Sequence, residues 1–264
     1  MVLFLVFLNF IQEGFNVVSE ASAPGPSADS ATMIAFGDEG VPTPSAIFLL
    51  PLPDDGPRYD LEASGPGATL FQQGVTAYAK GEHAAADMFF REFTRRFPQS
   101  LLVPSAFAFL AELILVDPAD TQQRLAAIES YRTLLRQFPT SANASRARWR
   151  IGDLYAEHGW WFEAQTAYKR AFGDSSVPDD RARARLGAGV AFLAERKWSE
   201  ATNAFEEIRA RSRDERLIPY ASIGLAEARY GAKRVGDARS LYESSFTRWP
   251  DFFKQRPEVL RHYG

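Results

Sequence analysis

A small apolar residue followed four positions later by an aromatic residue recurs along most of the chain. The last four copies are spaced by 37 residues, and a fifth lies 41 residues upstream of them. The copies are Ala86 with Phe90, Ala127 with Tyr131, Ala164 with Tyr168, Ala201 with Phe205, and Ala238 with Tyr242. A period of this length is typical of stacked units that complete their apolar faces against one another. The pattern therefore predicts five stacked units, with four extra residues in the second.

A second small residue, upstream of each of these alanines, indicates what the unit is. It stands twelve positions earlier in four copies, as Gly74, Gly152, Gly189 and Ala226, and is Ala111 in the second copy if the insertion separates two helices. Two small residues at this separation fit two antiparallel helices whose backbones approach closely. Glycine costs about 1 kcal/mol relative to alanine inside a helix, so its recurrence argues for close packing. We therefore expect an all-α fold of five helix pairs.

Proline and glycine mark the expected ends of these helices. Proline follows the aromatic by eight residues in three copies, at Pro98, Pro139 and Pro250. Lacking an amide donor, it is expected to end the second helix there. Gly81 and Gly159 stand between paired helices, where a short turn needs a positive φ.

At these positions the chain resembles the tetratricopeptide repeat (TPR) family. The first copy carries Gly74, Gly81, Ala86, Phe90 and Pro98, and the third carries Gly152, Tyr155, Gly159, Trp161, Ala164, Tyr168 and Ala171. The resemblance covers residues 67–250 and implies a right-handed solenoid of about five helix pairs with a concave inner face. The longer links, Phe-Pro-Gln-Ser at 97–100 and Phe-Pro-Thr-Ser at 138–141, are similar to a subgroup found in bacterial envelope proteins. That subgroup includes outer-membrane assembly lipoproteins and the Tol-Pal coordinator.

In the resembled family the first helix of each pair lines a concave groove, and this implies a partner-binding site. The corresponding residues here are Phe71, Tyr78, Phe109, Arg146, Trp149, Arg150, Asp153, Arg183, Tyr220 and Tyr230. Tyr, Trp and Arg often carry binding energy at interfaces, and Arg pairs bidentately with carboxylates. We expect a peptide or helix of a protein partner to bind in this groove. The alternative is that Phe71 and Trp149 only pack on the neighbouring copy and that Arg146 and Arg150 are solvated.

The residues before the repeats divide into a leader and a linker. Residues 1–23 resemble an export signal, with an apolar run at the start and Ala21-Ser22-Ala23 at their end. No Lys or Arg precedes that run, so an uncleaved anchor near a membrane and a mis-assigned start are alternatives. We expect the chain in the periplasm or cell envelope, and the cytoplasm is the alternative location.

Residues 24–66 are rich in Pro, Gly, Ser and Ala, which predicts a linker, yet residues 46–52 are apolar. Residues 47–50 of this run are expected to cap the first helix pair. The alternative is an extended docking peptide, either for the protein's own groove or for a partner. Residues 251–264 are expected to form a capping segment after the repeats.

Charge is divided unevenly along the chain. Residues 1–67 contain nine acidic side chains and one basic one, Arg58, whereas the remainder holds 29 basic and 24 acidic side chains. Such a division would let the acidic leader lie against the repeat surface, or it serves solubility alone. Acids interleave the second of two arginine clusters, at residues 209–216, and the sequence pI is about 5.7, so we expect no nucleic-acid partner.

The sequence offers no recognisable catalytic chemistry. The chain has no cysteine, which excludes disulfides, thiolate catalysis and sulfur-ligated zinc. His83 and His158 stand in units too far apart to share a metal, and phosphate-loop and nucleophile motifs are lacking. We therefore expect no enzyme, no cofactor and no metal. The function expected is a protein–protein interaction scaffold of the bacterial cell envelope. The alternatives are a targeting or regulatory subunit for an envelope enzyme such as a peptidoglycan hydrolase, and a cytoplasmic adaptor that serves assembly or forms homo-oligomers.

Overall fold

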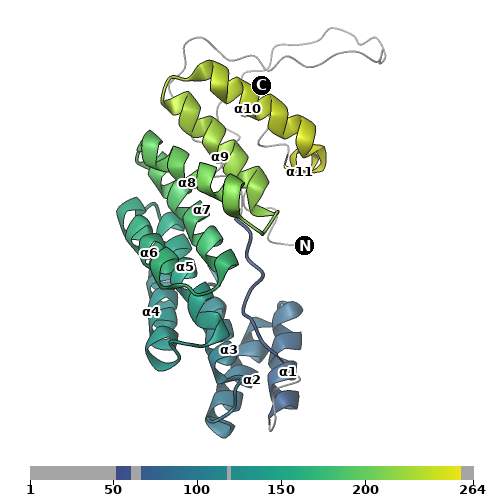
Figure 1. The fold of residues 1–264 in the computed structure, drawn as a ribbon. Helices are drawn as coiled ribbons and strands as arrows, with labels where there is room; N and C mark the ends of the chain where they lie inside the picture. Colours follow the sequence, from purple (N-terminus) through teal and green to yellow (C-terminus); the bar gives the residue numbers. More distant parts are fainter. Residues whose placement is uncertain (1–51, 61–66, 118–119, 257–264) are drawn as a thin grey trace, which may run out of the picture. The chain divides into compact units, whose positions relative to one another are not determined.

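The computed structural model describes residues 52–60, 67–117 and 120–256 (Figure 1). By its contacts the chain divides into the units Met1–Ala35 and Phe36–Gly264, and every described residue belongs to the second unit. The described residues form eleven helices and no strand, which confirms the all-α prediction. None of these described helices is long and apolar enough to span a membrane.

Ten of the helices form five consecutive pairs joined by short turns or links (Figure 1). The pairs are α1 (Ala68–Ala79) with α2 (His83–Arg96), α3 (Val103–Leu113) with α4 (Thr121–Gln137), α5 (Ala142–Glu157) with α6 (Trp161–Asp174), α7 (Pro178–Ala194) with α8 (Trp198–Arg211), and α9 (Leu217–Gly231) with α10 (Val235–Arg248). The short helix α11 (Pro250–Lys254) follows them. Each helix packs on the next, and the first helices α3, α5, α7 and α9 also contact one another in that order. The insertion of the second copy falls between α3 and α4, as predicted.

The helix ends follow local chemistry. Helices α2, α4 and α10 end immediately before Phe97, Phe138 and Trp249, each of which precedes a proline. The side chain of Asp120 caps α4 by accepting the backbone N–H groups of residues 122 and 123 at 2.7 and 3.3 Å. These ends agree with the punctuation expected from the sequence.

The turns inside the pairs need a left-handed residue. Gly81 and Gly159 have φ values of 74° and 82°, which confirms the expectation from their place in the sequence. The corresponding residues of the last two pairs are Arg196 and Lys233, with φ values of 57° and 65°. The left-handed turn is therefore kept in these two pairs, although another residue replaces the glycine.

The recurring aromatic of a second helix packs between small residues of two first helices. A Cβ atom added at Gly189 of α7 would come within 2.6 Å of the Phe205 ring, and one at Gly224 of α9 within 2.4 Å of the same ring. The same arrangement recurs one pair earlier, with Tyr168, Gly152 and Gly187. Close packing, rather than flexibility, therefore explains these helical glycines.

We predict that Gly189→Ala lowers the free energy of unfolding by about 1–2 kcal/mol, because the added methyl group overlaps the Phe205 ring and overpacking exceeds the gain in helix propensity. Gly173→Ala is the matched control, since a Cβ there meets no atom within 4 Å on the exposed surface of α6. The control is expected to raise the stability by up to about 1 kcal/mol. Urea unfolding followed by circular dichroism measures both, and equal effects of the two substitutions would contradict the packing explanation.

Candidate functional site

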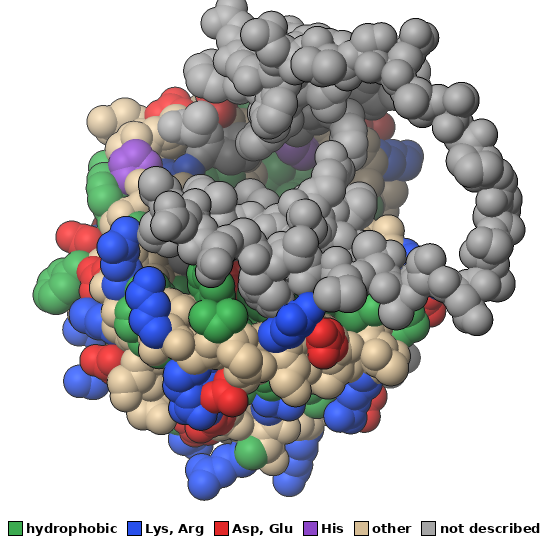
Figure 2. All heavy atoms as spheres, turned by 90° about the horizontal axis from the view of Figure 1, so that it is seen from above, with side chains coloured by type: hydrophobic (Ala, Val, Ile, Leu, Met, Phe, Trp, Pro, Cys, Tyr) green, Lys and Arg blue, Asp and Glu red, His purple; other side chains and the backbone are tan. Residues whose placement is uncertain are grey.

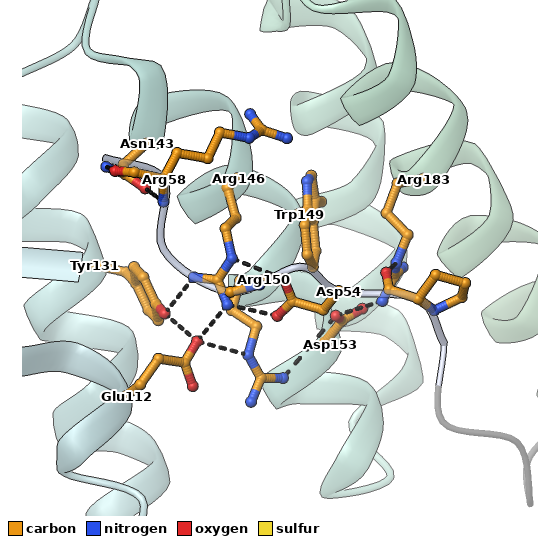
Figure 3. Close-up of polar contacts among 12 residues, drawn as sticks. Asp54, Arg58, Glu112, Tyr131, Asn143, Arg146, Trp149, Arg150, Asp153 and Arg183 are labelled. Atoms are coloured by element: carbon orange, nitrogen blue, oxygen red, sulfur yellow. Dashed lines mark hydrogen bonds and ion pairs between the residues drawn. The ribbon is translucent and has the colours of Figure 1, made fainter. Parts of the chain in front are cut away.

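Residues 52–60 lie along the first helices of the stack in an extended path, and we call them the docked segment (Figure 1, Figure 3). Leu52 packs against the apolar cluster of α7 to α10. The Tyr59 ring, seven residues further on, lies 5.6 Å from the ring of Phe71 in α1 and 5.9 Å from that of Phe109 in α3. The segment therefore runs opposite to the order of the helices. The polar residues that bind it form the docking face: Ser105, Asn143, Arg146, Asp180, Arg183 and Arg216.

The backbone of Arg58 is bound by side chains from two helices. The Asn143 amide of α5 accepts the Arg58 N–H at 2.8 Å and donates to the Arg58 carbonyl at 2.8 Å (Figure 3). The Ser105 hydroxyl of α3 donates to the same carbonyl at 2.7 Å. Because these bonds involve only main-chain atoms of the segment, they recognise an extended backbone rather than a particular side chain.

The guanidinium of Arg58 forms a bidentate ion pair with Asp180 of α7, with both N–O distances at 2.6 Å. The Asp180 side chain is 2% exposed. Its Oδ1 also accepts the indole N–H of Trp149 at 3.0 Å. The hydrogen bond to Asp180 raises the pKa of Arg58. A bidentate pair of this kind fixes the orientation of both partners.

Asp54 of the segment meets Arg146 of α5 in the same manner (Figure 3). The Nε atom of Arg146 donates to Asp54 Oδ1 at 2.8 Å, and its Nη2 atom donates to the other carboxylate oxygen. Arg146 also binds Glu112 of α3 at 2.7 Å and the Tyr131 hydroxyl of α4 at 3.0 Å. Burial acts to raise the pKa of Asp54, but the hydrogen bond and charge of Arg146 outweigh it, so that the pKa lies below its usual value.

Arg183 of α7 continues this arrangement toward the start of the segment. It donates to the Pro53 carbonyl at 2.8 Å and to Asp153 at 2.6 Å. Its guanidinium lies 4.5 Å from the Trp149 ring, and that of Arg146 lies 5.5 Å from the same ring. Trp149 thus packs against two cations and is only 3% exposed.

The acids of two first helices accept hydrogen bonds from tyrosines of the second helices. Tyr168 donates to Asp153 at 2.6 Å, and Tyr131 donates to Glu112. Burial raises the pKa of Asp153 above its usual value. For Glu112 burial acts in the same direction, but the charges of Arg150 and Arg146 outweigh it and lower the pKa. Each acid therefore bonds both to a buried tyrosine hydroxyl and to an arginine of the docking face.

Arg150 acts on the docked segment through its charge, which helps to lower the pKa of Asp54. It binds Glu112 at 3.2 Å and Glu157 at 2.7 Å within the stack. The outermost ion pair of the segment is Asp55 with Arg216, at 2.6 Å, where both side chains are more than half exposed. The hydrogen bond from Arg216 lowers the pKa of Asp55.

The remaining predicted groove residues lie on α1, α3 and α9. Phe71 is fully buried, and Tyr78 and Phe109 lie beside one another with ring centroids 5.1 Å apart. Tyr220 is buried beside Phe252 and Arg256, and Tyr230 is 40% exposed. The structure therefore brings Arg146, Trp149, Arg150, Asp153 and Arg183 into one connected network but keeps the two α9 tyrosines outside it.

The alternative interpretation of the central arginines and Trp149 is answered by their surroundings. Arg146 is 2% exposed, so it is not solvated. Trp149 does pack on the neighbouring copy, through Arg183, while also binding Asp180. Residues 47–50, expected to cap the first helix pair, lie outside the described residues. Leu52, the only described residue of that apolar run, packs at the α7 to α10 end of the stack.

Besides Arg216, which stands outside the repeat register, the sequence interpretation missed Ser105, Asn143 and Asp180. The repeat register would have found them: Asn143 and Asp180 stand nine positions before Gly152 and Gly189. Ser105, Arg146 and Arg183 stand six positions before the small residue of their own first helix. Both positions bind the segment in α5 and α7, and the second of them does so in α3.

Charge on the described surface is mixed. Figure 2 shows Lys and Arg side chains interleaved with Asp and Glu side chains over the described part that is visible in this view. The described residues contain no group of three or more His, Asp or Glu side chains that could hold a metal ion.

Comparisons with known proteins agree with this architecture. Residues 68–100 match the family model of the tetratricopeptide repeat. No curated protein sequence matches the chain. The chain therefore has a TPR-like all-α fold, and repeats of this type generally mediate protein–protein interaction without catalysis.

Several solved structures share the fold. MamA aligns with a TM-score of 0.53 and 16% identity, over 72% of this chain and 95% of that chain. A tetratricopeptide repeat protein from Parabacteroides merdae aligns with a TM-score of 0.56 and 15% identity, over 74% and 73%. The pilF protein of Pseudomonas aeruginosa aligns with a TM-score of 0.53 and 20% identity, over 74% and 88%. At these identities the likeness is one of fold alone.

We predict that Asp54→Asn lowers the free energy of unfolding by about 1–3 kcal/mol, because it removes the charge that pairs with buried Arg146. Asp55→Asn, the neighbouring control, breaks the exposed pair with Arg216 and is expected to cost less than about 0.5 kcal/mol. Urea unfolding at neutral pH compares the two variants. Equal losses would contradict the assignment of the central ion pair.

We also predict how the difference in stability between the native chain and Asp54→Asn depends on pH. The folded-state pKa of Asp54 is lowered, so its contribution is present above the unfolded-state value of about 3.9 and is lost as pH falls through the folded pKa. The difference should be constant from about pH 5 to pH 7 and should shrink below about pH 4. Urea unfolding at a series of pH values measures it, and a difference that grows on acidification would contradict the prediction.

Proposed function

We propose that the chain is a non-enzymatic protein–protein interaction scaffold of the bacterial cell envelope that holds an extended peptide of a partner on its docking face. One observation carries the proposal: the face holds residues 52–60 by main-chain hydrogen bonds and ion pairs from α3, α5, α7 and the start of α9. Contacts of this kind are those by which a binding surface recognises an extended peptide.

Burial at the centre of the face supports the same conclusion. Arg146, Asp180 and Arg183 are each at least 95% buried when the segment is in place. Residues that carry binding energy at interfaces are typically central, desolvated and rich in Arg and Trp, with exposed polar contacts around them. Here Trp149 lies at the centre, and the exposed Asp55–Arg216 pair lies at the edge.

Placement in the cell envelope rests on the sequence. The export-like residues 1–23 and the absence of cysteine support it, as does the similarity of the Phe-Pro links to those of envelope proteins. Residues 1–23 lie outside the described residues, so this part of the proposal depends on the sequence alone.

The proposal predicts that a photoreactive residue at Tyr78 on α1 and one at Tyr230 on α9, the first helices of the first and last pairs, capture the same identified protein in living cells. Phe162 is the matched control, because it is 69% exposed on the second helix α6, away from the docked segment. The captured complex should be in the envelope fraction, and mass analysis should show a mature protein that lacks Met1. Mass spectrometry identifies the crosslinked partner and determines the N-terminus of the mature protein.

Equal capture from Phe162 would contradict binding at the docking face. An intact Met1 in a cytosolic complex would contradict the envelope placement and favour the adaptor alternative. A peptidoglycan hydrolase among the partners would favour the targeting alternative.

A further inference from the structure

The docked segment makes the contacts of a bound ligand, although it belongs to the same chain. Its backbone is bound at Pro53 and Arg58, and three of its side chains form ion pairs with three different helices or their caps. In these three ion pairs, the two residues are 92 to 161 positions apart in the sequence. Charge and hydrogen bonding therefore hold the segment on helices that lie far from it in sequence.

The apolar cores beneath the segment consist almost wholly of helix residues. The four clusters of buried residues draw on the helices and their links, and Leu52 joins one of them only as a partly buried neighbour. Helix packing therefore does not depend on burying the segment.

The docking face keeps hydrogen-bond partners within the stack for every residue that the segment engages. Arg146 also binds Glu112 and Tyr131, Arg183 also binds Asp153, Asp180 also binds Trp149, Asn143 also binds Ser105, and Arg216 also binds Asp214. Opening such a site is usually costly because it leaves buried charges without partners. Here, after removal of the segment, each of these buried charges keeps an opposite charge or a hydrogen-bond donor. A face with these second partners is suited to exchange one extended ligand for another.

The pattern of charge on the face defines what can replace the segment. Two arginines, Arg146 and Arg216, bind the adjacent carboxylates Asp54 and Asp55, whereas the carboxylate of Asp180 binds Arg58. A purely acidic ligand would leave Asp180 facing like charge. The face therefore favours a ligand that carries two neighbouring acids followed by an arginine.

We propose that residues 53–59 are a built-in ligand of the docking face, and that a partner of this protein binds the face by displacing these residues. The partner presents an extended peptide with two adjacent carboxylates and an arginine three residues after the second carboxylate. This inference rests on the proposed function and names the chemistry of its partner. The built-in ligand is joined to α1 through residues 61–66, so it competes at a high effective concentration. A free peptide must therefore bind less tightly to the native chain than to a chain whose segment is disabled.

The test uses a synthetic peptide of residues 51–60, Pro-Leu-Pro-Asp-Asp-Gly-Pro-Arg-Tyr-Asp, and the full-length chain. The chain is labelled with 5-fluorotryptophan, and the Trp149 resonance is assigned with a Trp149→Phe variant. Titration followed by fluorine NMR then reports binding, because Trp149 lies between the two arginines that hold the segment. The segment is disabled by Asp54→Asn with Asp55→Asn and Arg58→Gln, and separately by Arg58→Gln alone, which alters no residue of the docking face. The matched control chain is Asp251→Asn, an exposed substitution in α11.

The peptide is expected to shift the Trp149 resonance and to bind both disabled chains at least ten-fold more tightly than the native and Asp251→Asn chains. The same peptide with Asn in place of both Asp residues should bind at least ten-fold more weakly. Loss of binding to both disabled chains, equal affinity for all chains, or equal affinity of the two peptides would each overturn the proposal. So would mixed dimers of native and disabled chains in sedimentation, which would assign the segment to a second copy. These outcomes do not depend on capture of a partner in cells, so failure here is distinguishable from failure of the proposed function.

Discussion

The packing of one aromatic ring between two first helices is the constraint on which the rest of the structure depends. Phe205 contacts Gly189 of its own pair and Gly224 of the next, so the ring joins three helices at once. Because a larger residue at either glycine would separate the helices, this contact sets the distance between successive first helices. Docking-face residues at equal register, such as Asn143 and Asp180, are therefore held at a regular spacing on α5 and α7. An extended segment can then bind several helices together.

The type of aromatic also links the core to the charge of the docking face. Tyrosine is accompanied by an acid one position after the small residue of the first helix, and phenylalanine by valine: Tyr131 with Glu112, Tyr168 with Asp153, Phe90 with Val75, and Phe205 with Val190. A buried tyrosine hydroxyl needs a hydrogen-bond acceptor, which the acid supplies. A phenylalanine in the same place would leave the carboxylate without that donor. The acids then pair with Arg146 and Arg183 of the next first helix. The arginines that hold the segment are thus oriented from the core outward.

The repeats could be predicted from the sequence because their packing is local and periodic. The small residues and aromatics placed the five pairs, the insertion between α3 and α4, and the turns at Gly81 and Gly159. The docked segment could not be placed in the same way, since it repeats nothing and meets its partners far along the chain. The excess of acid before the repeats left two interpretations open, contact with the repeat surface or solubility alone, because charge alone cannot select which arginines are bound. Asn143 was overlooked because it binds backbone, which leaves no complementary side chain to find.

Ion pairs at the centre of such a face contribute more to selectivity than to net stability. Taking two charges out of water costs nearly as much as their attraction returns, whereas an unmatched charge at the same place is strongly unfavourable. Asp180 therefore acts mainly against ligands that lack a cation at the position of Arg58, and Arg146 against those that lack an acid at the position of Asp54. Since the two sites lie on different helices, reversing a peptide would bring like charges together at both. The face consequently distinguishes the direction of an extended chain as well as its composition.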